Sequence, residues 1–192
     1  MNNLIDRTHQ DILEKIVALA KIAREQPPFF SAFIQQYYAH TDLETLKSRS
    51  IENLAAAVVS HWDLAYQRLP DQNKVNIFNP SLEKEGWETK YTVVQLITED
   101  KPFLVDSTRM EINRQGFNIF FSVNIGDIKL RRNSEGKLIE VLASNAALPE
   151  SQVEALIYME IDKISDPEAL KKLTHKLEKV LEQVSVVVKD WP

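Results

Sequence analysis

The sequence predicts an α+β protein, with a helical bundle over residues 1–70 followed by an antiparallel sheet that carries helices on one face, over residues 71–192. Up to about residue 70, apolar side chains recur at intervals of three and four, which is the period of an amphipathic helix. From residue 74 onward, short runs rich in β-branched side chains alternate with turns, which is typical of strands. All four glycines lie between residues 86 and 136, so the tight turns belong to the second region.

The first region begins with two predicted helices. One is expected over residues 8–25, and it ends before Pro27 and Pro28 because the residue before a proline is pushed out of helical geometry. An aromatic-rich helix is expected to follow over residues 29–38.

Two further helices in this region are predicted from their caps. Thr41 and Glu44 have the spacing of a capping box, which predicts a short helical turn. Ser50 is a favourable N-cap for a longer helix over residues 51–68.

The sequence of the second region predicts five strands and a last helix. The strands are expected at residues 75–78, 91–98, 117–132 (bent by a bulge at Gly126), 137–142 and 155–161. Residues 133–136 form the expected hairpin turn, with Gly136 suited to a positive φ. The last helix starts near Ser165 and Pro167, and its apolar stripe suits either a coiled-coil seam or, as we favour, one face of the sheet.

The most informative stretch joins the second and third strands. The apolar run 93–97 ends at a charged turn, Pro102 fits the first turn of a helix, and Gly116 ends that helix before a strand opens at Asn118. Strand, turn, helix, glycine and strand form the opening half of a ferredoxin-like α/β sandwich. The usual last strand is missing after the final helix, and we expect residues 75–78 to take its place beside the strand 91–98, covering an otherwise free edge.

Composition excludes several classes of function. The chain has no cysteine, so it has neither disulfides nor thiolate chemistry, and its four histidines are dispersed, which argues against a metal site. We interpret His61, beside Trp62, as a packed structural residue. The net charge of −5 argues against a nucleic-acid partner. No apolar run approaches the roughly 20 residues that cross a bilayer, and the N-terminus lacks the basic region and apolar core of a signal peptide. The absence of cysteine favours the cytoplasm.

The turn at residues 98–106, with the Gly-Phe-Asn-Ile that follows at 116–119, resembles the ACT family of small regulatory domains. In that family an Asp-Lys/Arg-Pro-Gly-Leu turn precedes the helix, and the domains sense ligands or assemble. The chain is similar, over nearly its whole length, to the N-terminus of the large bacterial NAD-specific glutamate dehydrogenases. The motifs that carry this second resemblance are Tyr37-Tyr38, Ser60-His61-Trp62, the run 74–80, Gly86-Trp87, the run 102–107, the run 159–162, the run 165–167 and Asp190-Trp191.

The second resemblance implies a non-catalytic regulatory and assembly domain of a much longer enzyme. The parent would convert glutamate and NAD to 2-oxoglutarate, ammonium and NADH. The chain itself has no Gly-x-Gly-x-x-Gly turn, so we expect no cofactor here and NAD in the parent. The implied partners are downstream ACT-like and catalytic modules, with a homo-oligomer and an amino-acid effector left open and no membrane partner.

Two alternatives to this function remain at this point. A free-standing ACT-type amino-acid sensor would differ by having a stop codon soon after Pro192. An RNA-binding ferredoxin-like domain is the weakest alternative, because it would need exposed aromatic side chains on the sheet among basic residues.

An effector would be expected at the charged turn and the start of the next strand. The candidate effector-binding residues are Glu99, Asp100, Lys101, Pro102, Phe103, Asp106 and Asn118. A helix N-terminus attracts anions and Lys101 would add positive charge. The structural alternative, which we favour, has Asp100 capping the helix, Lys101 solvated and Asp106 pairing locally.

Phe103 departs from the ACT pattern, which has glycine at this position so that backbone N–H groups can approach a ligand carboxylate. The phenylalanine would obstruct that approach or fill the core. The glutamate dehydrogenase family favours the same Pro-Phe-Leu-Val-Asp version, so Phe103 supports that resemblance and argues against amino-acid binding.

Overall fold

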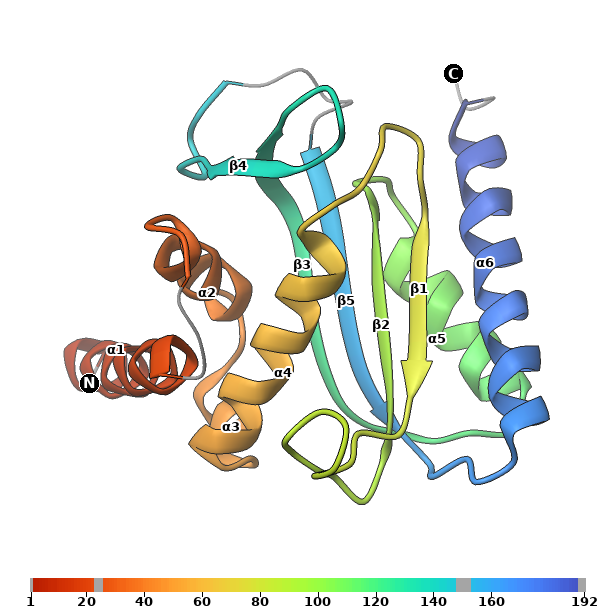
Figure 1. The fold of residues 1–192 in the computed structure, drawn as a ribbon, viewed down its shortest axis with the longest axis horizontal. Coiled ribbons are helices and arrows are strands. Elements are labelled where there is room, and N and C mark those ends of the chain that lie inside the picture. Colours follow the sequence, from red (N-terminus) through yellow and green to blue (C-terminus); the bar gives the residue numbers. More distant parts are fainter. Residues whose placement is uncertain (1, 23–25, 148–152, 190–192) are drawn as a thin grey trace.

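The computed structural model of the chain describes residues 2–22, 26–147 and 153–189, and it has the expected α+β fold. Figure 1 shows a curled sheet with the N-terminal helices on one side and the later helices on the other. The elements are α1 (Asn2–Ile22), α2 (Phe30–Tyr38), α3 (Leu43–Lys47), α4 (Ile51–Ala65), β1 (Lys74–Phe78), β2 (Thr92–Glu99), α5 (Leu104–Arg114), β3 (Ile119–Arg132), β4 (Leu138–Val141), β5 (Val153–Ile161) and α6 (Pro167–Lys189).

The strands form one sheet in the order β1-β2-β5-β3-β4, and all neighbours are antiparallel. β1 pairs with β2 from Lys74 opposite Ile97 to Phe78 opposite Val93. The prediction that residues 75–78 replace the missing last strand is therefore confirmed. The physical reason is that β2 is buried from Thr92 to Thr98, so its backbone N–H and C=O groups need hydrogen-bond partners at both edges.

The sheet separates two hydrophobic cores, because successive side chains of a strand point to opposite faces. The core under α1–α4 includes Phe33, Tyr37, Val58, Trp62, Phe121 and Tyr158. The core under α5 and α6 includes Val94, Leu104, Ile112, Ile157, Leu173, Leu177 and Leu181. The stripe of α6 therefore lies on the sheet, as we favoured. The N-terminal helices share their core with the sheet, and the division into two domains at residue 70 stays a prediction.

Two helices start at other positions than predicted. α1 begins at Asn2 rather than Thr8, and its predicted end at Glu25 lies outside the described residues. The N-cap of α3 is Asp42, not Thr41, because the Asp42 carboxylate accepts the Thr45 backbone N–H at 2.8 Å. Ser50 caps α4 as predicted.

The predicted bulge in β3 is confirmed, although its strained residue is the neighbour of Gly126. The register against β5 shifts between Ile125 and Ile128, and Asp127 adopts a φ of 56°. Aspartate tolerates this left-handed region better than most side chains. The bulge bends the strand so that its end can pair with β4.

Gly136 has the predicted positive φ, at 80°, and a second reason to be glycine. A Cβ atom there would lie 2.5 Å from the Arg68 carbonyl oxygen. The close approach has a purpose, because the Arg68 N–H donates to the Gly136 carbonyl at 2.9 Å. The hairpin is thereby bound to the segment that follows α4.

Candidate functional site

The predicted effector turn lies between β2, which ends at Glu99, and α5, which begins at Leu104. Pro102 was expected in the first turn of the helix and instead lies before it. The cause is Phe103, whose φ of 71° is in the left-handed region and cannot continue a right-handed helix backward.

Phe103 does not fill the core, which was one expectation for its side chain. It occupies the N-cap position of α5, makes no side-chain cap, and the residue is 52% exposed. A bulky residue with positive φ is a genuine conformational outlier, which glycine adopts freely. The chain therefore keeps phenylalanine at a position where both the backbone and the exposure of the ring are unfavourable.

Asp100 was expected to cap α5, and the structure contradicts this. Its carboxylate accepts the Asp127 backbone N–H at 2.8 Å, across the bulge of β3. Burial raises the pKa of Asp100, while the hydrogen bond from Asp127 opposes that rise. Asp100 therefore fastens the β2–α5 turn to β3, so it is not available to the helix N-terminus.

Lys101 is not solvated, contrary to the structural alternative. Its Nζ lies 2.9 Å from a Glu99 carboxylate oxygen and donates to the Ser185 hydroxyl of α6 at 3.2 Å. Only 11% of the side chain is exposed. The Lys101 ammonium group is therefore already paired within the chain. Asp106 lies exposed in the first turn of α5, where a negative charge suits the helix dipole.

A small pocket of about 130 Å³ lies at this turn. It is lined by Asp100, Lys101, Phe103, Leu104, Val105, Asp106, Ile125, Gly126, Ala155 and Ile157. Ligand pockets usually measure about 300–1,000 Å³. Its size and mainly apolar lining make it a poor cradle for an amino acid.

Asn118 lies at the opposite end of the sheet from this turn, which corrects the predicted grouping. Next to it Ile119 pairs with Ile161, the last residue of β5, whereas Glu99 pairs with Glu154 at the other end of β5. The reason is that α5 carries the chain back along the sheet before β3 starts. The Asn118 amide donates to the Asp162 carboxylate at 2.9 Å, which ties the end of β5 to the start of β3.

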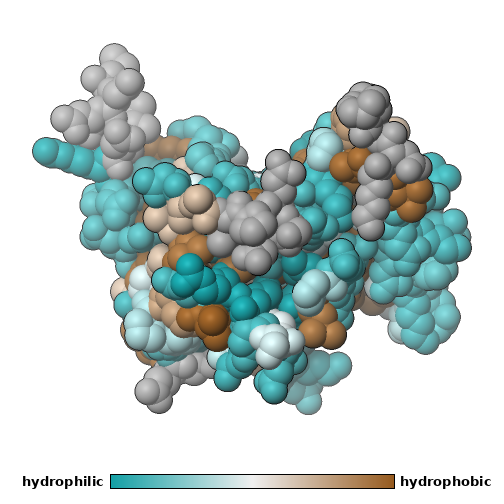
Figure 2. All heavy atoms as spheres, turned by 90° about the horizontal axis from the view of Figure 1, so that it is seen from above, coloured by the Kyte–Doolittle hydropathy of each residue, from teal (hydrophilic) through white to brown (hydrophobic). Residues whose placement is uncertain are grey.

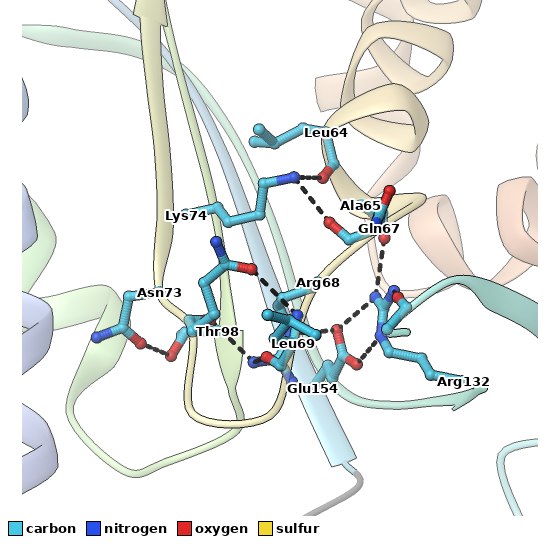
Figure 3. Close-up of polar contacts among 12 residues, drawn as sticks. Leu64, Ala65, Gln67, Arg68, Leu69, Asn73, Lys74, Thr98, Arg132 and Glu154 are labelled. Carbon is cyan, nitrogen blue, oxygen red and sulfur yellow. Dashed lines mark hydrogen bonds and ion pairs between the residues drawn. The ribbon is translucent and has the colours of Figure 1, made fainter. Parts of the chain in front are cut away.

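The sequence interpretation missed a buried ionic cluster at the end of α4, drawn in Figure 3. The Glu154 carboxylate of β5 accepts the Nε–H groups of Arg68 at 3.0 Å and Arg132 at 2.6 Å. Arg132 adds a second bond to Glu154 through Nη2 at 2.9 Å. The Glu154 side chain is only 2% exposed. A glutamate one residue before the predicted strand 155–161 was the only sequence signal, and periodicity could not reveal its partners.

Basic side chains of the same region bind the carbonyls at the C-terminal end of α4. The helix ends at Ala65, not at the predicted Arg68. Lys74 Nζ donates to the carbonyls of Leu64 at 2.6 Å and Gln67 at 2.8 Å. Arg132 donates to the carbonyl of Ala65 at 2.8 Å. Cations suit a helix C-terminus because of its dipole. Burial, followed by the charges of Arg132 and Arg68, lowers the pKa of Lys74.

His61 is structural, as interpreted. Its Nε2 lies 3.0 Å from the Leu96 carbonyl, which can only accept, so Nε2 carries the proton. The unprotonated Nδ1 therefore accepts the Tyr37 hydroxyl at 2.9 Å. Burial lowers the pKa of His61 to about 3, so the ring stays neutral.

The fold defines the class of the chain as an ACT-like α+β domain, built on a ferredoxin-like sheet. In the described ranges 2–22, 26–147 and 153–189, no three side chains of the metal-binding types gather into a site. Within the same ranges, no helix has the length and apolar character to span a bilayer.

Comparison with known proteins agrees with this class. The family model for the glutamate dehydrogenase ACT1 domain matches residues 33–177, and the chain belongs to this family. Among the described elements, that match spans every strand, most of α2, all of α3 to α5 and the first half of α6.

Two curated relatives are both named NAD-specific glutamate dehydrogenase. The chain is 34% identical to the one from Pseudomonas aeruginosa over 164 residues, which is 85% of this chain and 10% of the relative. It is 30% identical to the one from Halomonas elongata over 172 residues, which is 90% of this chain and 11% of the relative. The chain thus spans about a tenth of the length of these relatives. No solved structure gave a significant match.

Proposed function

We propose that this chain is a non-catalytic regulatory and assembly domain at the N-terminus of a large NAD-dependent glutamate dehydrogenase. The observation that carries the proposal is the family match, which covers the sheet and part of each helical layer. The parent enzyme would convert glutamate and NAD to 2-oxoglutarate, ammonium and NADH. NAD would bind to another module, because this chain contains no glycine-rich dinucleotide turn.

Regulation, in this proposal, acts through packing between modules rather than through an amino acid bound at the β2–α5 turn. The charged groups of that turn already bind one another or neighbouring elements: Asp100 binds the bulge of β3, and Lys101 binds Glu99 and Ser185. A turn tied to β2, β3 and α6 can pass a displacement of α6 to the sheet. A partner that prefers one arrangement of these elements would shift the equilibrium between arrangements.

The enzyme assignment is tested by measuring glutamate-dependent NADH formation with the isolated chain and with the complete polypeptide that contains it. We expect activity only from the complete polypeptide. NADH formation by the isolated chain would overturn the non-catalytic role, and an inactive complete polypeptide with a folded catalytic region would overturn the parent reaction.

The packing role is tested by an amide NMR titration of the chain with glutamate, aspartate and arginine. We expect no saturable shift at Glu99, Asp100, Lys101, Pro102-Phe103 or Asp106 (Pro102 being followed through its neighbours because it has no N–H). Saturable shifts clustered there would identify an effector site and overturn regulation by packing alone. Asn118 serves as an internal control, because it lies at the other end of the sheet.

A further inference from the structure

The sheet ends at β1, whose outer edge has no strand beside it in the described part of the chain. All five residues of β1 are nevertheless partly buried. Val75 and Ile77 pack on the core under α6, while Asn76 and Phe78 line a groove of about 870 Å³ on the opposite face, next to α4. An edge strand with covered faces and a free row of backbone groups is a template for a further strand.

The backbone groups that point outward from β1 belong to Val75 and Ile77. Where β2 ends, the Asp100 N–H donates to the Val153 carbonyl at 2.9 Å, so the even-numbered residues of β2 direct their backbone groups toward β5. The odd-numbered residues of β2 therefore face β1 and pair with its even-numbered residues, Asn76 among them. Val75 and Ile77 alternate with these residues, so their N–H and C=O groups lie at the free edge.

The end of α6 lies near the start of β1. The Asn79 amide, just after β1, donates to the Ile164 carbonyl, just before α6, at 2.8 Å. At the other end, Lys101 follows β2 and contacts Ser185 near the end of α6, and this end of β2 pairs with the first residues of β1. α6 is therefore antiparallel to β1, and it finishes at the end of the sheet where β1 begins (Figure 1). Figure 2 views the molecule from this end and shows hydrophobic residues at the surface there.

We propose that the segment that follows this chain in the longer polypeptide adds a sixth strand to the outer edge of β1, parallel to it. The inference rests on the proposed function, in which this chain is the N-terminal tenth of a longer polypeptide. A segment returning from the end of α6 runs in the direction of β1, and Val75 and Ile77 supply its hydrogen bonds. Its side chains on one face enter the groove beside β1 and are apolar, because Val59, Phe78 and Trp87 line that groove.

The topology favours this segment over a strand from elsewhere. β5 and β1 are both antiparallel to β2, so the path from β5 through α6 to the new strand joins parallel strands. Compared with the crossover β2–α5–β3, which has its helix on the same face, this path starts from a strand of opposite direction and crosses the sheet the opposite way. Both crossovers therefore have the same hand, as such connections do in nearly all proteins. The tether at the end of α6 also gives this segment a high effective concentration at the free edge.

Amide hydrogen exchange, resolved to single residues by mass spectrometry, tests the proposal on the isolated 192-residue chain and on the complete polypeptide. We expect the Val75 and Ile77 amides to exchange at least about tenfold more slowly in the complete polypeptide, because hydrogen-bonded amides exchange only when the strand opens. Asn76 is the matched control: its N–H faces β2, so it should be protected already in the isolated chain. Equal rates for Val75 and Ile77 in the two samples would overturn the proposal.

Val75→Pro tests the outward direction of the backbone groups. Proline removes one outward N–H and places its ring at the edge, while the bonds of β1 to β2 remain. In the complete polypeptide this variant should return the Ile77 amide to its rate in the isolated chain, while protection of Asn76 shows that β1 is still folded. An Ile77 amide that stays protected in this variant would overturn the proposal.

Photocrosslinking identifies the source of the strand, with a benzophenone side chain in place of Asn76 in the complete polypeptide. We expect the crosslinks that leave this chain to reach residues within about 20 positions after Pro192, the length of a short connection and a strand. Crosslinks confined to residues 1–192, or reaching a distant part of the polypeptide or a second copy, would overturn the proposal. None of these readouts uses glutamate or NAD, so an inactive polypeptide would overturn the parent reaction without changing the exchange and crosslinking results.

Discussion

The face of the sheet under α1–α4 carries buried charged and polar side chains, whereas the opposite face, under α5 and α6, is formed mainly by aliphatic ones. On the first face, Glu154 binds two arginines, Glu160 binds Arg49, and His61 binds Tyr37. On the second face, the buried polar groups of the strands are threonines whose hydroxyls donate hydrogen bonds.

The difference indicates how each helical layer is positioned. Hydrogen bonds and ion pairs are directional, so the first layer is held in one place by specific partners. Apolar burial is non-directional, so the second layer is held mainly by the shape of its packing, with the Lys101–Ser185 hydrogen bond as a polar contact near the end of α6. The second layer also carries the groove between α5 and α6, which is lined by Met110, Val184 and Val187 among others.

Glu154→Ala tests the polar face and should have the largest effect. It leaves Arg68 and Arg132 buried without their carboxylate, which should lower the free energy of unfolding by about 3–5 kcal/mol. Urea denaturation measures the loss. Glu140→Ala is the control, since its pair with Arg131 is about half exposed and should be worth no more than about 1 kcal/mol. Equal losses in both variants would contradict the importance of the buried cluster.

Leu177→Ala tests the aliphatic face. Leu177 is fully buried under α6, so its truncation should cost about 3 kcal/mol through lost burial and a residual cavity. Val186→Ala on the same helix is 60% exposed in the wild type and should stay within about 0.5 kcal/mol. Similar urea midpoints for the two variants would mean that α6 is not held by this core.

The polar face should also respond to pH through His61. Its folded pKa of about 3 lies below the usual 6.5, so the unfolded chain binds the extra proton and stability falls as the pH drops below 6.5. Between pH 7 and pH 5 this should cost about 2 kcal/mol. His61→Gln should be less stable than the unsubstituted chain at pH 7. Between pH 7 and pH 5, however, its free energy of unfolding should fall by about 2 kcal/mol less than that of the unsubstituted chain. Parallel pH profiles would contradict a neutral buried His61.

The contact between the β3–β4 hairpin and the segment that follows α4 can be tested by substituting two glycines. Gly136→Ala meets both a positive φ and the Arg68 carbonyl, and it should cost about 2 kcal/mol. Gly86→Ala has a similar φ of 74° but nothing within 4 Å, so strain alone should cost about 1 kcal/mol. Thermal unfolding at neutral pH measures the difference, and equal shifts would mean that the close approach to Arg68 is unimportant.

Much of the fold could be predicted from the sequence because its signals are local. The change from helical to strand periodicity, the Ser50 cap and the Gly136 turn depend only on neighbouring residues. The pairing of β1 with β2 was also predictable, because a buried central strand with a missing neighbour leaves one place to fill.

The candidate site was less predictable because it depends on which residues meet in space. Six of the seven candidate residues do lie at one turn, but Asn118 lies at the other end of the sheet, because α5 rises 1.5 Å per residue between them. Glu154 was missed altogether, since its partners Arg68 and Arg132 come from different elements.

The sequence by itself determined the order and type of the elements, the fold class and the family, because these follow from periodicity, caps and motifs along the chain. The tertiary structure alone decided that Asp100 binds the bulge of β3, that Glu154 joins α4 to the sheet, and that Phe103 faces a groove instead of the core. These contacts join residues distant in the sequence, and a charge or an aromatic ring has many partners available to it until the sheet and helices have packed.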